Sequence, residues 1–309
     1  MVTIYLFNMK HISTIIKTES MKQEAPINTG FKFLDETLGG FYPGEMTTIC
    51  GSEDCGKTAF VITQLNRIAV DQHIPTLFVL NNMTERNFLS SMIAYYCNIK
   101  TNNVHSIIDS DLHQYSVKAY LKMLSEAPLY VVSSDWFEDK AFFEMIEKII
   151  VEKEIKIAFF DEVVHYEILA ESGSMSYFKT LSMKLGIPVV STCCIWNYRE
   201  GLEGIVPALP DLRKYCELHG HDVVISFIKY EQYHVYQDDN GRDLHDTIGV
   251  EILKHKGKVE KRTHFLPIGC LYLRNYTQQQ KASLEVIKQS NFYKVDTLIK
   301  RFDLEIDEQ

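Results

Sequence analysis

Short apolar runs alternate with segments of helical periodicity along most of the chain. Runs of this kind, rich in β-branched and aromatic residues, are typical of buried parallel strands, and they occur at 46–50, 75–80, 129–133, 156–160 and 187–192. The segments between them place apolar residues three and four positions apart, which predicts helices at 59–69, 84–96, 110–126, 140–150 and 174–185. This alternation predicts an α/β fold with a mostly parallel central sheet flanked by helices.

The last third of the chain changes to a β-rich pattern. Strands are predicted at 223–227 and 250–254, and the turn residues from Asp238 to Gly241 between them favour an antiparallel pair. A further strand is expected at 264–268. We therefore expect a β-hairpin at one edge of the sheet.

The domain boundaries follow from the same pattern. Residues 1–26 show no clear period and end in Pro26, which indicates an N-terminal arm or linker. No break in composition follows, so one domain is expected over residues 27–275. Helical periodicity from about 278 to 302 predicts a C-terminal helical extension over residues 276–309.

One segment between a predicted strand and a predicted helix carries a phosphate-binding motif, G-x-x-x-x-G-K-[ST]. Its glycines allow backbone N–H groups to turn around a polyphosphate, and the following helix N-terminus adds a positive dipole end. Lys57 is expected to reach the β- and γ-phosphates, and the Thr58 hydroxyl is expected to ligate Mg²⁺. The predicted nucleotide-binding residues of this loop are Gly51, Ser52, Glu53, Asp54, Cys55, Gly56, Lys57 and Thr58.

An acidic pair follows the apolar strand at 156–160. Asp161 stands where a carboxylate can order the water shell of Mg²⁺, which takes oxygen ligands and keeps several waters; a strand-ending acid without a metal is the alternative. The Asp161-Glu162 pair resembles the two acids of P-loop ATPases, in which the second acid polarises water. A surface or interface acid is the other interpretation of Glu162.

Composition narrows the setting of the protein. The net charge of −9 and the pI near 5.7 give no overall attraction to nucleic acid, although a ring can keep basic groups inside its pore. Seven cysteines show neither C-x-x-C nor zinc spacing, which favours buried thiols in a reducing, cytoplasmic setting. No apolar run approaches the length of a membrane span, so no membrane partner is expected.

The order of the motifs resembles the ATPase domain of DnaB-type replicative DNA helicases. The resemblance covers about residues 27–270 and includes, in chain order, Thr29-Gly30-Phe31, Leu34-Asp35, Gly39-Gly40-Phe41, Pro43-Gly44, the phosphate-binding loop, Asp161, Pro188-Val189, Asp211-Leu212-Arg213, Asp222-Val223-Val224, residues 229–233 and Lys254-His255-Lys256-Gly257. It implies a RecA-like core that binds ATP and Mg²⁺ at the subunit interfaces of a hexameric ring, with single-stranded DNA in the pore. It also implies that the N-terminal, primase-contacting domain of those helicases is missing.

Two positions depart from the pattern of this family. Asn82 stands where the family places its catalytic glutamate, and an amide cannot accept a proton as a carboxylate does; Glu162 and Glu85 are the candidate replacements. The hairpin pair that includes an arginine in the family appears here as Lys254, a predicted nucleotide contact, and Lys256, a predicted catalytic cation. Lysine lacks the bidentate fork of arginine, so both departures predict slow hydrolysis or simple nucleotide binding.

The loops expected to face a pore carry little positive charge. Residues 165–173 include two acids and no Lys or Arg, and the second loop sets Arg199 beside two acids. Phosphate neutralisation supplies most non-specific affinity for nucleic acid, so weak binding of single-stranded DNA is expected. Arg199, Arg213 and Lys214 are the predicted nucleic-acid contacts.

Two functions follow from this sequence. The order of the family motifs favours ATP-dependent DNA unwinding or translocation in replication. Asn82, Lys256 and the acidic pore loops favour a non-catalytic or regulatory nucleotide-binding ring protein, related to the RecA and KaiC group. ATP turnover with and without single-stranded DNA distinguishes the two.

Overall fold

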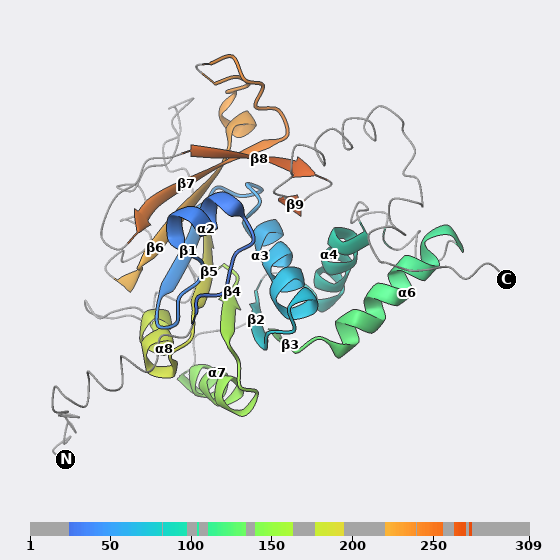
Figure 1. Cartoon of the computed structure of the whole chain (residues 1–309), viewed down its shortest axis with the longest axis vertical. Coiled ribbons are helices and arrows are strands. Elements are labelled where there is room, and N and C mark those ends of the chain that lie inside the picture. The colour runs from blue at the N-terminus through green and yellow to red at the C-terminus, as the bar shows by residue number, and fades with distance from the viewer. Residues whose placement is uncertain are drawn as a thin grey trace.

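A nine-stranded sheet runs through the described part of the chain in the order β3-β2-β4-β5-β1-β6-β7-β8-β9 (Figure 1). Its strands are β1 (Met46–Gly51), β2 (Thr76–Leu80), β3 (Leu129–Ser133), β4 (Ile157–Phe160), β5 (Val189–Cys194), β6 (Val223–Lys229), β7 (Thr247–His255), β8 (Thr263–Gly269) and β9 (Tyr272–Leu273). The computed structural model describes residues 25–81, 83–97, 104, 111–133, 140–162, 177–194, 220–238, 240–255, 263–269 and 272–273. None of the helices within these ranges combines the length and the apolar character needed to cross a bilayer.

The first six strands of this order are parallel. β1 pairs in parallel with β5 and β6, while β2 pairs in parallel with β3 and β4. Every residue of β1, β2, β4 and β5 is buried, which explains why these segments are apolar runs rather than alternating patterns. β7 is antiparallel to both β6 and β8, so the predicted hairpin edge on a mostly parallel sheet is confirmed.

Helices cover both faces of the sheet. They are α2 (Lys32–Leu38), α3 (Lys57–Leu65), α4 (Glu85–Cys97), α6 (Asp111–Glu126), α7 (Lys140–Glu152) and α8 (Tyr177–Leu185). The pleat sends Phe78 and Leu80 into the core shared with α3, α4 and α6, and sends Leu77 and Val79 into the core shared with α7 and α8. Two separate apolar cores therefore pack against the sheet, one on each face.

The predicted strands and helices up to residue 268 are present wherever the structure describes them, with shifted ends. Thr84 caps α4, since its hydroxyl accepts the Asn87 N–H at 3.2 Å. The segment after α3 differs from the prediction, because the helix continues as a π-helix over Asn66–Asp71. The arm before residue 25 and the helical extension after residue 275 lie outside the described residues.

The sequence pattern did not predict α2. Asp35 lies in the first turn of this short helix. Its carboxylate accepts hydrogen bonds from the Thr29 N–H, the Thr29 hydroxyl and the Gly30 N–H, at 2.8, 2.8 and 2.9 Å. It ends at Gly39, which takes the left-handed conformation with φ of 82°. Seven residues show too little periodicity to be recognised, and the helix depends on these end contacts.

Candidate nucleotide-binding site

The site lies where β1, β4 and β5 reach their carboxyl ends. These strands are neighbours in the sheet order β4-β5-β1, and parallel pairing brings their ends to the same edge. The phosphate-binding loop follows β1, Asp161 follows β4, and Thr192 lies near the end of β5. Ligands bind at this edge in open α/β sheets.

The loop after β1 adopts a backbone that its sequence permits. Gly51 approaches other chain segments so closely that an added Cβ would lie 2.4 Å from the Phe227 carbonyl oxygen and 2.5 Å from the Cys55 sulfur. Gly56 has φ of 94°, a left-handed conformation that glycine adopts without strain, and α3 begins at the next residue. The first N–H groups of α3 are therefore available to bind an anion at this loop.

Lys57 is held inside this loop and is only 7% exposed. Its ammonium donates to the carbonyl oxygens of Gly51 at 3.0 Å and Ser52 at 2.6 Å. Burial raises the pKa of the neighbouring Cys55 thiol, although the Lys57 charge acts in the opposite direction. The ammonium lies beside the loop backbone, where a polyphosphate would accept its hydrogen bonds.

Asp161 meets the loop from the end of β4 and is 2% exposed. The Thr58 hydroxyl lies 3.3 Å from its Oδ2 and 3.5 Å from its Oδ1, while the Thr192 hydroxyl donates to Oδ1 at 2.6 Å. Burial raises the pKa of Asp161 to about 6; the Glu162 charge adds to the rise, whereas the Thr192 and Thr58 hydrogen bonds oppose it. The structure thus brings together the two residues predicted to serve the metal.

This donor set fits Mg²⁺. The Thr58 hydroxyl and the Asp161 carboxylate offer hard oxygen atoms 3.3 Å apart beside the phosphate-binding loop. Within the described residues there is no cluster of three or more His, Cys, Asp or Glu side chains of the kind that encloses a metal alone. Mg²⁺ bound through one or two protein oxygens, substrate phosphates and water needs no such cluster.

Glu162 takes an unusual backbone conformation for its residue type, with φ of +53°. Its N–H donates to the Thr192 hydroxyl at 2.8 Å, and its carbonyl accepts the Asn81 side-chain amide at 3.4 Å. The structure places Glu162 next to Asp161 and to the end of β2, while Asn82 lies outside the described residues. The role of either residue in activating water stays a prediction.

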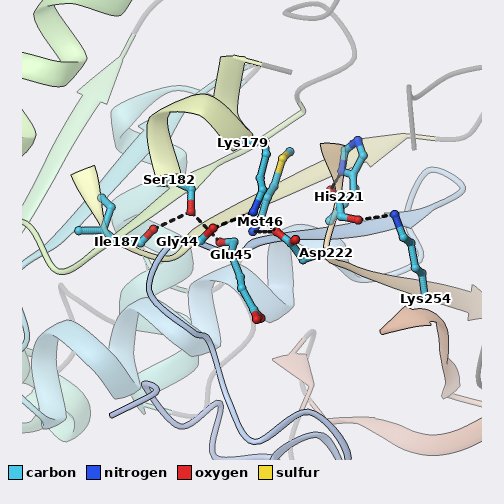
Figure 2. Close-up of polar contacts among 10 residues, drawn as sticks. Gly44, Glu45, Met46, Lys179, Ser182, Ile187, His221, Asp222 and Lys254 are labelled. Atoms are coloured by element: carbon cyan, nitrogen blue, oxygen red, sulfur yellow. Dashed lines mark hydrogen bonds and ion pairs between the residues drawn. The ribbon is translucent and has the colours of Figure 1, made fainter. Parts of the chain in front are cut away.

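Lys254 lies toward the other end of the sheet (Figure 2). Its β7 position pairs with Val224, and its ammonium donates to the His221 carbonyl at 2.5 Å, close to the ion pair of Lys179 with Asp222. β1 runs from this region to the phosphate-binding loop, so Lys254 does not reach the loop of its own chain. Nucleotide binding by Lys254 stays a prediction and requires a second subunit.

Four other predicted site residues, namely Lys256, Arg199, Arg213 and Lys214, lie outside the described residues. Two contacts of the loop region were not predicted. Gln232 lies on the short 3₁₀ helix Tyr230–Tyr233 after β6, where its side chain accepts the Ser52 hydroxyl at 2.5 Å and donates to the Glu53 carbonyl at 2.7 Å. Thr192 was also missed, and no motif includes it. Gln232 belongs to the 229–233 element of the resemblance, but no site role was predicted for it.

The fold is that of a RecA-like domain, since the loop after β1, the helix that follows it and the strand-end acid occupy one sheet edge. The model of the DnaB-like helicase C-terminal domain matches residues 26–265, and the chain belongs to this family. The fold prediction and the resemblance seen in the sequence are therefore confirmed.

Relatives and solved structures agree with this assignment. The chain is similar to the replicative DNA helicase DnaB of Treponema pallidum (strain Nichols), with 26% identity over 197 residues, 60% of this chain and 44% of that protein. It is also similar to the DnaB helicase of Nostoc sp. (strain PCC 7120 / SAG 25.82 / UTEX 2576), with 23% identity over 64% of this chain and 23% of that protein. The chain thus spans less than half the length of both.

Two solved structures share the fold at 15% identity and a TM-score of 0.68. One is a DnaB-like replicative helicase, described with its interactions with primase. The match covers 67% of that chain and 85% of this chain. The other is the ATPase domain of the protein G40P, with coverage of 97% of that domain and 86% of this chain. The match to an isolated ATPase domain shows that the described core is of that architecture.

Proposed function

We propose that the chain binds ATP with Mg²⁺ and acts as a subunit of a replicative-helicase-like ring on single-stranded DNA. The observation that carries this proposal is the approach of Thr58 and Asp161, 103 residues apart in sequence, beside a glycine loop that opens a helix. Membership in the DnaB-like helicase C-terminal domain family supports the same function.

Each residue of the site has a role in this proposal. The loop N–H groups and Lys57 hold the β- and γ-phosphates, and the Lys57 ammonium exchanges the carbonyls of Gly51 and Ser52 for phosphate oxygens. Thr58 and Asp161 hold Mg²⁺, which neutralises charge that develops on the transferred phosphoryl group. Glu162 accepts a hydrogen bond from the attacking water, which lies in line with the bond to be broken.

Hydrolysis is proposed to be slow. Asn82 stands where the resemblance expects a glutamate, so the carboxylate proposed to act on water is that of Glu162, which follows β4 rather than β2. Lys254 donates to a carbonyl of its own chain, and a subunit interface would have to draw it away before it met a neighbouring nucleotide. This contact favours the second candidate function, a ring protein that binds nucleotide and assembles without unwinding DNA.

The experiment compares ATP turnover with and without a single-stranded oligonucleotide. The motor function predicts turnover that the oligonucleotide stimulates and that Lys57→Ala abolishes, while Lys184→Ala, an exposed lysine on α8, changes nothing. Tight MgATP binding with no turnover in either condition supports the assembly function instead. Sizing the protein with and without a non-hydrolysable ATP analogue then tests ring formation directly.

A further inference from the structure

A single hydroxyl lies between the two acids that follow β4. Thr192 is fully buried on β5, and its Oγ1 donates to Oδ1 of Asp161 at 2.6 Å. The same oxygen accepts the backbone N–H of Glu162 at 2.8 Å. One side chain therefore contacts the candidate metal-side carboxylate and the backbone of the candidate water-activating residue.

The sheet register explains how Thr192 reaches both. Phe160 pairs with Ser191 in the parallel β4–β5 ladder, so the next residues, Asp161 and Thr192, are neighbours across the strands. β4 ends at Phe160, and the Glu162 N–H turns to the Thr192 side chain. Glu162 itself has a left-handed backbone conformation, with φ of +53°.

The two hydrogen bonds have separate consequences. Thr192 donates to Oδ1 at 2.6 Å while the Thr58 hydroxyl lies 3.3 Å from Oδ2, so the carboxylate of Asp161 is held by Thr192 in a position beside Thr58. Because Thr192 also accepts the Glu162 N–H, it restrains the peptide plane that precedes the Glu162 side chain. A positively valued φ in a non-glycine residue persists only where surrounding contacts maintain it.

We propose that Thr192 is the positioning residue of this site: its hydroxyl aims Asp161 at the Mg²⁺ position and holds Glu162 in place beside it. The inference rests on the proposed function, since it assigns a role within the same nucleotide site. Groups that orient metal ligands affect metal affinity or activity by about 10- to 100-fold when removed, and we expect an effect of that size here.

Three variants separate the hydroxyl from the space it fills. Thr192→Val keeps the shape and removes both hydrogen bonds, whereas Thr192→Ser keeps the hydroxyl. Thr76→Val is the matched control, because Thr76 is also fully buried in the sheet and its hydroxyl donates to the Ile74 carbonyl at 2.8 Å, away from both acids. A purely structural role would make the two valine variants behave alike.

The first readout is the Mg²⁺ dependence of binding to a fluorescent ATP analogue. Thr192→Val is expected to raise the Mg²⁺ concentration for half-maximal binding by about 10- to 100-fold, with affinity in excess EDTA unchanged. Thr192→Ser and Thr76→Val are expected to stay close to the wild-type value. Equal Mg²⁺ dependence in the wild type and Thr192→Val overturns the role toward Asp161.

The second readout needs no nucleotide. Hydrogen exchange at the Glu162 amide, followed by NMR, is expected to be about tenfold faster or more in Thr192→Val and unchanged in Thr192→Ser, since the N–H loses its acceptor. If the wild type binds no nucleotide and this pattern still appears, the proposed function fails and the positioning of Glu162 stands. Unchanged exchange in Thr192→Val overturns the inference whatever the protein binds.

Discussion

The polar groups at the two ends of the parallel sheet differ in how they are hydrogen-bonded. At the amino end, Lys179 contacts Asp222 at 2.7 Å and the Gly44 carbonyl at 2.8 Å, while Asp222 accepts the Met46 N–H at 2.8 Å (Figure 2). At the carboxyl end, the contact between Thr58 and Asp161 is long, at 3.3–3.5 Å. The amino-end contacts are all short, whereas Asp161 at the carboxyl end combines one short hydrogen bond, from Thr192 at 2.6 Å, with this long contact to Thr58.

Positive φ does not distinguish the two ends, because Glu162 has it after β4 and Glu154 has it before β4. The difference lies in how the polar groups are paired. At the amino end, the Ser182 hydroxyl contacts the carbonyl oxygens of Glu45 and Ile187 at 3.0 and 2.8 Å (Figure 2). We infer that the contacts at the amino end stabilise the fold, whereas the groups at the carboxyl end are arranged for binding a ligand. Four predictions test this difference.

The largest expected effect is the pH dependence of stability due to His221. Burial lowers the pKa of His221 from 6.5 to about 4; the Lys254 charge lowers it further, and Asp222 opposes the change. The unfolded chain therefore binds this proton first, so stability is intact above pH 6.5 and falls as pH decreases toward 4. The loss is about 3 kcal/mol at about 1.4 kcal/mol per pKa unit.

Urea unfolding between pH 7 and pH 4 measures this effect. His221→Gln is expected to show a shallower loss of stability than the wild type over that range, because the titrating group is gone. Matching slopes for the two proteins would show that His221 is not the buried neutral base described here.

A slightly smaller effect is expected from the ion pair at the same end. Lys179→Met removes the ammonium that contacts the Gly44 carbonyl and Asp222, and leaves Asp222 with the Met46 N–H but no countercharge. It should lower the free energy of unfolding by about 2–3 kcal/mol, since the Lys179 and Asp222 side chains are only 13% and 29% exposed. Lys184→Met on the same helix is the control. Lys184 pairs with Glu147 at 2.6 Å on the surface and is 57% exposed, so its loss should cost about 0.5 kcal/mol. Equal costs in urea unfolding would contradict the comparison.

At the carboxyl end the sign should reverse. The pKa of Asp161 is raised from 3.8 to about 6, so the stability associated with its neutral form is present below pH 3.8 and lost as pH rises through 6. Asp161→Asn removes this charge and should stabilise the nucleotide-free protein at pH 7 by about 1–2 kcal/mol. The same variant should lose Mg²⁺-dependent nucleotide binding. Destabilisation in thermal or urea unfolding would show that the carboxylate serves the fold.

The smallest effect concerns Gln232, which joins the 3₁₀ helix to the phosphate-binding loop. Gln232→Ala should cost about 0.5–1 kcal/mol of stability, since both hydrogen bonds are exposed to solvent. Amide exchange in the loop should nevertheless become faster. Gln72→Ala, a change at another exposed glutamine, is the control and should leave amide exchange in the phosphate-binding loop unchanged. Equal amide exchange in the two variants would show that Gln232 does not restrain the loop.

The fold could be predicted from the sequence because strands buried on both faces are rich in apolar and β-branched residues and lack a polar face. β1, β2, β4 and β5 show this pattern, and the glycine motif identifies the loop. α2 could not be predicted, because it depends on contacts of Asp35 with Thr29 and Gly30 rather than on periodicity. Local backbone contacts of this kind leave little trace in hydrophobic patterning.

The site was predictable only in part, for the same reason. The motif located Lys57 and Thr58, and the apolar strand located Asp161. Thr192 and Gln232 act across separations of 31 and 180 residues, and the sequence does not indicate which segments they contact until the sheet order is known. The position of Lys254 also required the register, which places it away from the loop of its own chain.

The most direct test of the central claim is a calorimetric titration of MgATP into the wild type and Lys57→Ala. The account predicts saturable binding by the wild type with a Kd of about 1–100 μM, and binding at least about 100-fold weaker in the variant, because a buried cation that contacts phosphate has been removed. The absence of saturable binding to the wild type, or equal affinity in the two proteins, would contradict the claim that this loop holds a nucleotide.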